Sequence, residues 1–213
     1  MRRIESSADA PGAPYDRRAA LYDGLVRSRI YNNLAWSSSP ADYAAFAAKA
    51  VASDDGPLLD AGAGSAAATA HLHAHSNRPS VLLDLSRAML ERADARIDAA
   101  GAPAGHVRLC QADLLDPPFP RGGFTTVLAM GVAHLFEDLP ALLASLRGQL
   151  ASGGELYLTS LVGETRRGRA YLRALHRAGE LATPLTADQL CQQLGRTRSF
   201  TTRGCMAYAI LDA

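Results

Sequence analysis

Two glycines stand between a short apolar segment and an alanine-rich one. The apolar segment is Leu58–Ala61, and Gly62 and Gly64 follow it. Glycine lets a backbone come close to a ligand, and the start of a helix offers free N–H groups to polar or negative groups. We therefore expect a strand from Pro57, a glycine turn and a helix over 65–75, with a ligand at the turn. A tight strand-to-helix turn without a ligand is the alternative for this motif alone.

Carboxylates end the next two apolar segments. Asp84 follows Val81-Leu82-Leu83, about 20 residues after the glycines. An acid at that position can accept hydrogen bonds from both hydroxyls of a ribose. Asp113 ends the third segment and is suited to accept from an adenine amino group. Because the carboxyl ends of parallel strands meet at one edge of a sheet, these residues predict a nucleotide-like ligand at that edge.

The elements that must position these residues alternate between short apolar strands and helices, which is typical of parallel crossovers. We predict an α/β fold with a Rossmann-like doubly wound seven-stranded sheet, mostly parallel with an antiparallel last strand. The expected strands after the first are 80–85, 106–111, 125–130, 154–160, 198–202 and 206–211. The expected helices after the glycine turn are 65–75, 87–100, 139–150, 166–178 and 186–194.

The length of 213 residues fits one domain of ordinary size. Residues 1–14 are polar, small and rich in Pro and Gly, so we expect them to lack fixed structure. Residues 15–213 are expected to form the domain. Within it, 15–53 would be a helical N-terminal cap and 54–213 the Rossmann-like core.

Composition excludes several classes of protein. The net charge of +1, from 22 basic and 21 acidic residues, argues against a nucleic-acid-binding surface. No run approaches about 18 apolar residues, so we expect no membrane span, and without a secretory signal we expect a cytoplasmic location. The three cysteines lack the spacing of a zinc site. His71, His73 and His75 lie near a predicted helix end, and we expect no metal there.

Together these motifs resemble those of class I S-adenosylmethionine-dependent methyltransferases, over residues 15–213. Within that family the chain looks most like the quinone-biosynthesis and related small-molecule enzymes. The segments that carry the resemblance are the DxGxG run Asp60-Ala-Gly62-Ala-Gly64, the ribose-side acid Asp84, the adenine-side acid Asp113, the fourth strand and loop 124–135, and the helix, turn and strand of 146–158.

The resemblance implies S-adenosylmethionine as cofactor and methyl transfer to an O, N or C atom of a small molecule. His134, just past the fourth strand, is the candidate catalytic residue, as a base or in acceptor binding. A structural histidine on a loop is the alternative. The implied cofactor-binding residues are Tyr22, Asp60, Ala61, Gly62, Gly64, Asp84, Leu85, Asp113, Leu114 and Met130.

Some features depart from that family or allow another function. Ala66 replaces the usual third glycine of the first motif, so the motif does not determine the backbone conformation at this position. The run Gly62-Ala-Gly-Ser-Ala-Ala67 also fits the dinucleotide fingerprint, so an NAD(P)-dependent oxidoreductase is the rival enzyme. A non-catalytic S-adenosylmethionine-binding module is the rival of another class. The run Asp116-Pro-Pro-Phe119 matches a signature of amino-methyltransferases, but it precedes the fourth strand instead of following it.

The predicted helix 166–178 is strongly basic. A run of this kind is usually a solvated face. The alternative is a wall or lid of an acceptor pocket that prefers anionic substrates. Its arginines are Arg166, Arg167, Arg169, Arg173 and Arg177.

Overall fold

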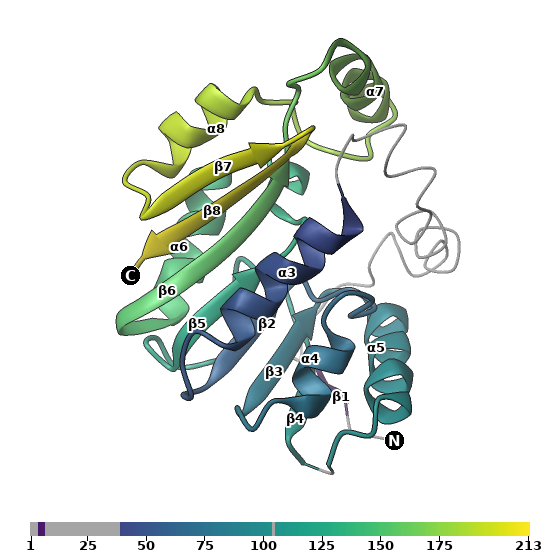
Figure 1. The fold of residues 1–213 in the computed structure, drawn as a ribbon, viewed down its shortest axis with the longest axis vertical. Helices are drawn as coiled ribbons and strands as arrows, with labels where there is room; N and C mark the ends of the chain where they lie inside the picture. The colour runs from purple at the N-terminus through teal and green to yellow at the C-terminus, as the bar shows by residue number, and fades with distance from the viewer. Residues whose placement is uncertain (1–3, 7–38, 104) are drawn as a thin grey trace.

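An eight-stranded sheet forms the centre of the protein (Figure 1). The computed structural model describes residues 4–6, 39–103 and 105–213. The strands lie in the order β1-β4-β3-β2-β5-β6-β8-β7, and only β8 runs antiparallel to its neighbours. The predicted α/β fold is confirmed. The strands are β1 (Ile4–Ser6), β2 (Leu58–Ala61), β3 (Ser80–Asp84), β4 (Val107–Gln111), β5 (Phe124–Ala129), β6 (Leu150–Leu161), β7 (Ser199–Arg203) and β8 (Met206–Asp212).

The prediction of seven strands was wrong by one, because β1 was not expected. Residues 4–6 fall in the segment predicted to lack fixed structure, yet they pair in parallel with Leu109–Gln111 of β4. Two side-chain contacts support this pairing. Ser6 Oγ donates to Gln111 Oε1 at 3.1 Å, and Arg108 pairs with Glu5 at 2.7 Å. A three-residue strand is stabilised by its neighbour and not by its own sequence pattern.

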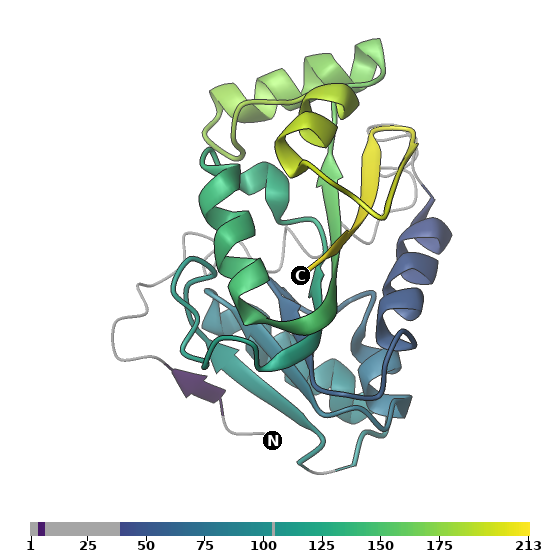
Figure 2. The ribbon, with the colours of Figure 1, turned by 90° about the vertical axis from the view of Figure 1, so that its left-hand side faces the viewer.

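Helices cover both faces of the sheet, and Figure 2 shows α3 and α6 on opposite sides of it. Side chains that follow each other in a strand point to opposite faces. Val127 and Leu156 accordingly pack with α6, while Leu128 and Tyr157 pack with α3. The helices are α3 (Pro40–Val51), α4 (Ala70–His75), α5 (Arg87–Ala99), the 3₁₀ turn η2 (Ala133–Leu135), α6 (Leu139–Gln149), α7 (Arg166–Arg177) and α8 (Ala187–Leu194).

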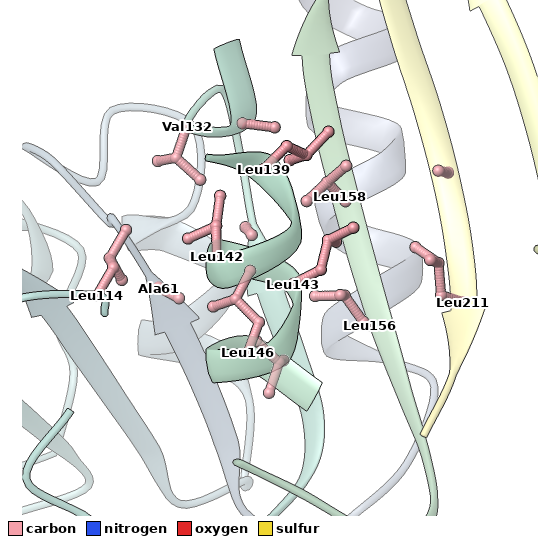
Figure 3. Packing of buried hydrophobic residues seen from close by; sticks show 14 of the residues in the cluster. Ala61, Leu114, Val132, Leu139, Leu142, Leu143, Leu146, Leu156, Leu158 and Leu211 are labelled. Carbon is pink, nitrogen blue, oxygen red and sulfur yellow. The ribbon is translucent and has the colours of Figure 1, made fainter. Parts of the chain in front are cut away.

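The larger core lies between the sheet and α6 (Figure 3). Leu142, Leu143 and Leu146 are at most 4% exposed and belong to this cluster. Leu143 lies toward Leu156 and Leu158 of β6, whereas Leu142 lies on the side of α6 toward Leu114. Helix α6 begins at a capping Asp138, whose carboxylate accepts from Ala141 N at 2.9 Å. This packing fixes the position of η2, which directly precedes α6 in the chain.

A buried arginine joins α3 to the sheet. Arg78 is 2% exposed, and its guanidinium donates to the carbonyls of Ala50, Val51 and Gly56. It also donates to the Thr126 hydroxyl at 2.9 Å. Burial lowers the pKa of Arg78 from its usual value. The end of α3 and the start of β5 are thereby held together.

Part of the predicted cap is described. Ser39 caps α3, and Pro40 is its first residue. Tyr22 and the other residues of 7–38 lie outside the described residues. Among the helices that are described, none has both the length and the apolar character needed to cross a bilayer.

Candidate functional site

Four neighbouring strands bring most of the predicted site residues to one edge of the sheet. Strands β4, β3, β2 and β5 are adjacent and parallel, so their carboxyl ends lie side by side. Asp113, Asp84, Gly62 and Met130 each follow one of these strands or end it. The sequence therefore predicted this cluster correctly, with Tyr22 outside the described residues.

The two glycines of the turn differ in their surroundings. Both have positive φ, +73° at Gly62 and +53° at Gly64. A β-carbon at Gly62 would overlap Val132 Cγ1 and lie 3.4 Å from Leu114 Cδ1. At Gly64, by contrast, a β-carbon would meet no atom within 4 Å. Gly62 is needed for close packing, whereas Gly64 faces open space in which a ligand can approach the backbone.

Asp84 is held against the glycine turn by two backbone groups. Its Oδ2 accepts from Gly64 N at 2.7 Å and its Oδ1 accepts from Ser86 N at 2.8 Å. The side chain is half-buried at the end of β3, and Ala61, the last residue of β2, is fully buried beside it in the sheet. Leu85 follows, and its carbonyl accepts from Gln111 Nε2 at 3.2 Å. The Asp84 carboxylate is thus oriented by the fold itself.

Asp113 and Leu114 form the next part of the edge. The Asp113 carboxylate accepts from Leu115 N at 2.9 Å and is half-buried. Leu114 is 9% exposed, and its carbonyl accepts from Ser145 Oγ of α6 at 2.6 Å. Leu115 is 46% exposed and is the one large hydrophobic side chain that stands out to solvent in the described part of the chain.

Asp60 lies beneath the turn and points toward α4. It is 1% exposed, and its Oδ2 accepts from Thr69 Oγ1 at 3.0 Å. His73 Nε2 lies 2.9 Å from the same oxygen, and His73 is fully buried. The sequence predicted Asp60 as a cofactor contact, and that contact stays a prediction. The geometry gives Asp60 a structural role under the turn, with Thr69 and His73 as partners that sequence reasoning missed.

The three histidines of this region do not share a site. His73 turns inward to Asp60, whereas His71 and His75 are exposed. His75 Nδ1 lies 2.7 Å from the His71 carbonyl. Within 4–6, 39–103 and 105–213, no three His, Cys, Asp or Glu side chains are grouped so that they could hold a metal ion.

The backbone at Ala66 takes the path of the glycine it replaces. Its φ is +51°, which makes it the one described non-glycine residue in the left-handed region. This conformation interrupts the helix predicted from Ser65, so α4 begins only at Ala70. Ala66 N donates to Ala63 O at 2.9 Å, which closes the turn. The helix prediction was wrong here because the left-handed backbone at Ala66 delays the start of α4.

The segment after β5 connects the glycine turn to a neighbouring cavity. Met130 packs with the α3 cluster, and Gly131 N donates to Thr159 Oγ1 at 2.7 Å. Val132 lies against Gly62. Ala133 and His134 then form part of the wall of a cavity of about 220 Å³. The cavity lies between η2, the end of β6, α7, the segment 181–185 and α8.

His134 is placed at this wall with a defined orientation. Its Nδ1 accepts from Leu161 N at 3.3 Å, so the neutral ring carries its proton on Nε2. Burial lowers the pKa of His134 from 6.5 to about 4. The imidazole is therefore uncharged near neutral pH and is a weak base. This geometry favours hydrogen-bond donation over the proton removal that the sequence suggested.

The basic residues of α7 point away from the cavity. Gly168 and Leu172 form the buried side of the helix, and Leu172 lines the cavity. The five arginines of α7 are exposed. Arg169 Nε donates to Gly163 O at 3.0 Å. The arginines form an exposed face, and none of them is among the described residues that line this cavity.

The first comparison with known proteins concerns residues 58–154. They match the model of a family described as a methyltransferase domain. This segment runs from β2 into β6 and holds every described cofactor-site residue named above. The matched segment covers 97 of the 213 residues and is called the methyltransferase domain below, after the description of that family. The match supports the resemblance to class I S-adenosylmethionine-dependent methyltransferases, and the glycine turn lies near the start of the matched segment.

One relative of the methyltransferase domain is a protein of unknown role. The chain is 31% identical over 122 residues to the uncharacterized protein syc1184_c of Synechococcus sp.. The match covers 57% of this chain and 28% of that protein. The chain thus spans under a third of the length of this relative.

Solved structures share the fold of the methyltransferase domain. Geranyl diphosphate C-methyltransferase from Streptomyces coelicolor, solved with Mg²⁺, geranyl diphosphate and S-adenosyl-L-homocysteine, matches with a TM-score of 0.67 at 16% identity. That match covers 95% of this chain and 99% of that chain. DhpI, solved with S-adenosylhomocysteine (SAH), matches with a TM-score of 0.63 at 21% identity, over 92% and 91%. At these identities the likeness shows a common fold.

Proposed function

We propose that the protein transfers a methyl group from S-adenosylmethionine to a small molecule. The observation that carries this proposal is the arrangement of Gly64, Asp84 and Asp113 at adjoining strand ends. Gly64 leaves open space above the turn, and Asp84 is fixed beside it by the Gly64 and Ser86 N–H groups. The solved relatives that hold S-adenosylhomocysteine support the choice of cofactor.

The hydrogen-bonding groups of the site fit this cofactor chemically. An ionised carboxylate accepts about four hydrogen bonds, so Asp84 can bind ribose hydroxyls while its backbone donors stay in place. Asp113, one strand further along the sheet, is suited to an adenine amino group. Small and apolar groups at Ala61, Gly62 and Leu114 close the floor of the site.

The chain itself needs few reacting groups. S-adenosylmethionine, when bound, supplies a methyl group already activated by its sulfonium. The protein then has to align the acceptor with that methyl group and exclude water. Met130 and Val132 are buried or half-buried between the turn and the cavity and suit this task. His134 is proposed as a residue that orients the acceptor.

The test is calorimetric titration with SAH. Asp84→Ala should weaken binding by roughly 100-fold, since charge-assisted hydrogen bonds to a ribose are worth about 1.5–3 kcal/mol each. Asp188→Ala, at an exposed position in the first turn of α8, is the matched control and should bind normally. Urea unfolding of both variants checks that the turn around Asp84 remains folded.

Three results would contradict the proposal. Wild-type protein that binds NAD or NADP more tightly than SAH would make it an oxidoreductase. SAH binding that does not depend on Asp84 would place the cofactor elsewhere. SAH binding without methyl transfer to any acceptor would make the protein a non-catalytic binding module.

A further inference from the structure

The cavity beside η2 has a largely apolar wall. Its apolar part includes Phe136, Leu139, Leu161, Leu172, Leu185 and Leu190, which come from η2, α6, β6, α7, the following segment and α8. A volume of about 220 Å³ is enough for a small organic molecule. Burial of apolar ligand surface is therefore the main source of affinity here.

The polar part of the wall carries no positive charge. Among its described residues there is no Lys or Arg, and His134 is neutral because burial lowers its pKa to about 4. The formally charged side chain is Glu137, whose Oε1 accepts from Thr183 N at 2.8 Å and from Thr183 Oγ1 at 3.3 Å. Glu137 is 65% exposed, and its Oε1 also lies 3.9 Å from His176 Nδ1. An anionic ligand would lose water and find this carboxylate in the wall, with no Lys or Arg among the described lining residues to pair with.

His134 offers one directed donor to this cavity. Its Nδ1 is used by Leu161 N, and its carbonyl is used by Ala182 N at 3.0 Å. Both contacts fix the ring and the segment 181–185 around it. The Nε2–H is the remaining polar group of the ring, and it can donate to an oxygen or nitrogen acceptor.

The cavity adjoins the proposed methyl-donor site. Val132 touches the Gly62 position, and Ala133, the next residue, lines the cavity. One short segment thus forms a wall of both sites. The Val132–Ala133 segment is the structural link between the cavity and the glycine turn.

We propose that this cavity binds the methyl acceptor, and that the acceptor is a small, uncharged and mainly apolar molecule with an oxygen or nitrogen that accepts from His134 Nε2–H. Its role as the methyl acceptor rests on the proposed function, whereas the cavity as a ligand site does not. This class differs from the diphosphate bound by the Streptomyces coelicolor relative.

Four probes of similar size separate the effect of ligand charge from the effect of a hydrogen-bond acceptor. Acetophenone is neutral with a carbonyl acceptor, toluene is neutral without one, benzoate is anionic and benzylamine is cationic. Binding is followed by NMR of leucine methyl groups, because Leu161, Leu172 and Leu190 line the cavity. We expect acetophenone to shift these methyl signals and to bind at least tenfold more tightly than benzoate. We expect it to bind more tightly than benzylamine as well, because the ammonium group loses water and can gain only the mostly exposed Glu137 carboxylate.

His134→Asn tests the donor. The asparagine amide can still accept from Leu161 N but has no group at the Nε2 position. We expect acetophenone binding to weaken by about threefold to tenfold, and toluene binding to stay unchanged. His71→Asn, on the exposed side of α4, is the control and should leave both unchanged.

Failure of this inference can be distinguished from failure of the proposed function. Equal or tighter binding of benzoate, or no shift of these three leucines with any neutral probe, overturns the inference whether or not SAH binds. An equal loss of toluene and acetophenone binding in His134→Asn overturns the donor role of His134. Probe binding in a protein that does not bind SAH supports the ligand site and contradicts the proposed function.

Discussion

Replacing His73 should unfold the protein more easily, although His73 lies outside the motifs of the sequence. In His73→Leu the Asp60 carboxylate, 1% exposed, keeps Thr69 as a donor and loses the imidazole 2.9 Å away. His73 Nδ1 is buried and has no hydrogen-bond partner among the described residues. The substitution therefore removes one polar contact, the one to Asp60.

The size of the effect follows from this burial. A hydrogen bond to a charged partner is worth about 1.5–3 kcal/mol, and breaking a buried pair costs about 3–5 kcal/mol. Because Thr69 remains, we expect His73→Leu to lower the free energy of unfolding by about 3 kcal/mol. For a chain of this size that is a fall in Tm of roughly 6–12 °C.

Urea unfolding with a double-mutant cycle measures the pair directly. The cycle contains His73→Leu, Asp60→Asn and the double variant, and their effects should be non-additive by at least about 1 kcal/mol. His71→Leu, at an exposed position of the same helix, controls for helix propensity and should change stability by less than about 0.5 kcal/mol. If His73→Leu costs no more than His71→Leu, or if the cycle is additive, the reasoning about Asp60 is refuted.

Two further predictions concern the turn and the cavity. Ala66→Gly should change the free energy of unfolding by less than about 1 kcal/mol, because relief of the +51° φ offsets the lost methyl burial and the greater freedom of the unfolded chain. Ala70→Gly, in the first turn of α4, should cost more in the same urea experiment. The pKa of His134 is lowered from 6.5 to about 4, so the unfolded chain binds the proton more tightly. Stability should therefore fall by up to about 3 kcal/mol as pH decreases from about 6.5 to 4, and urea unfolding of His134→Asn at several pH values should lack this loss.

The motif residues could be placed from the sequence because the order and direction of the strands determine where their ends lie. Once β2, β3 and β4 are parallel, Gly62, Asp84 and Asp113 must come together at one edge. Their spacing alone carries this information. The direction of each side chain is a different matter, since it depends on the partners that the fold supplies.

Asp60 shows how the direction of a side chain depends on its partners in the fold. It ends up beneath the turn because Thr69 and His73 approach it from α4, nine and thirteen residues later. A buried carboxylate needs such a partner, and the spacing of four between Thr69 and His73 was the available signal. The direction of α7 could also have been predicted, because Gly168, Leu172 and Leu175 share one helical face.

The strand β1 has a consequence for how copies of the protein meet one another. An open strand edge presents unpaired N–H and C=O groups that a second chain can extend. Residues Ile4–Ser6 shield the edge of β4, and the exposed Glu5–Arg108 pair places charges there. Loss of these three residues would remove Ile4 from the margin of the smaller core and open the edge of β4 to aggregation. Solubility would then depend on a segment that lies outside the proposed methyl-donor site.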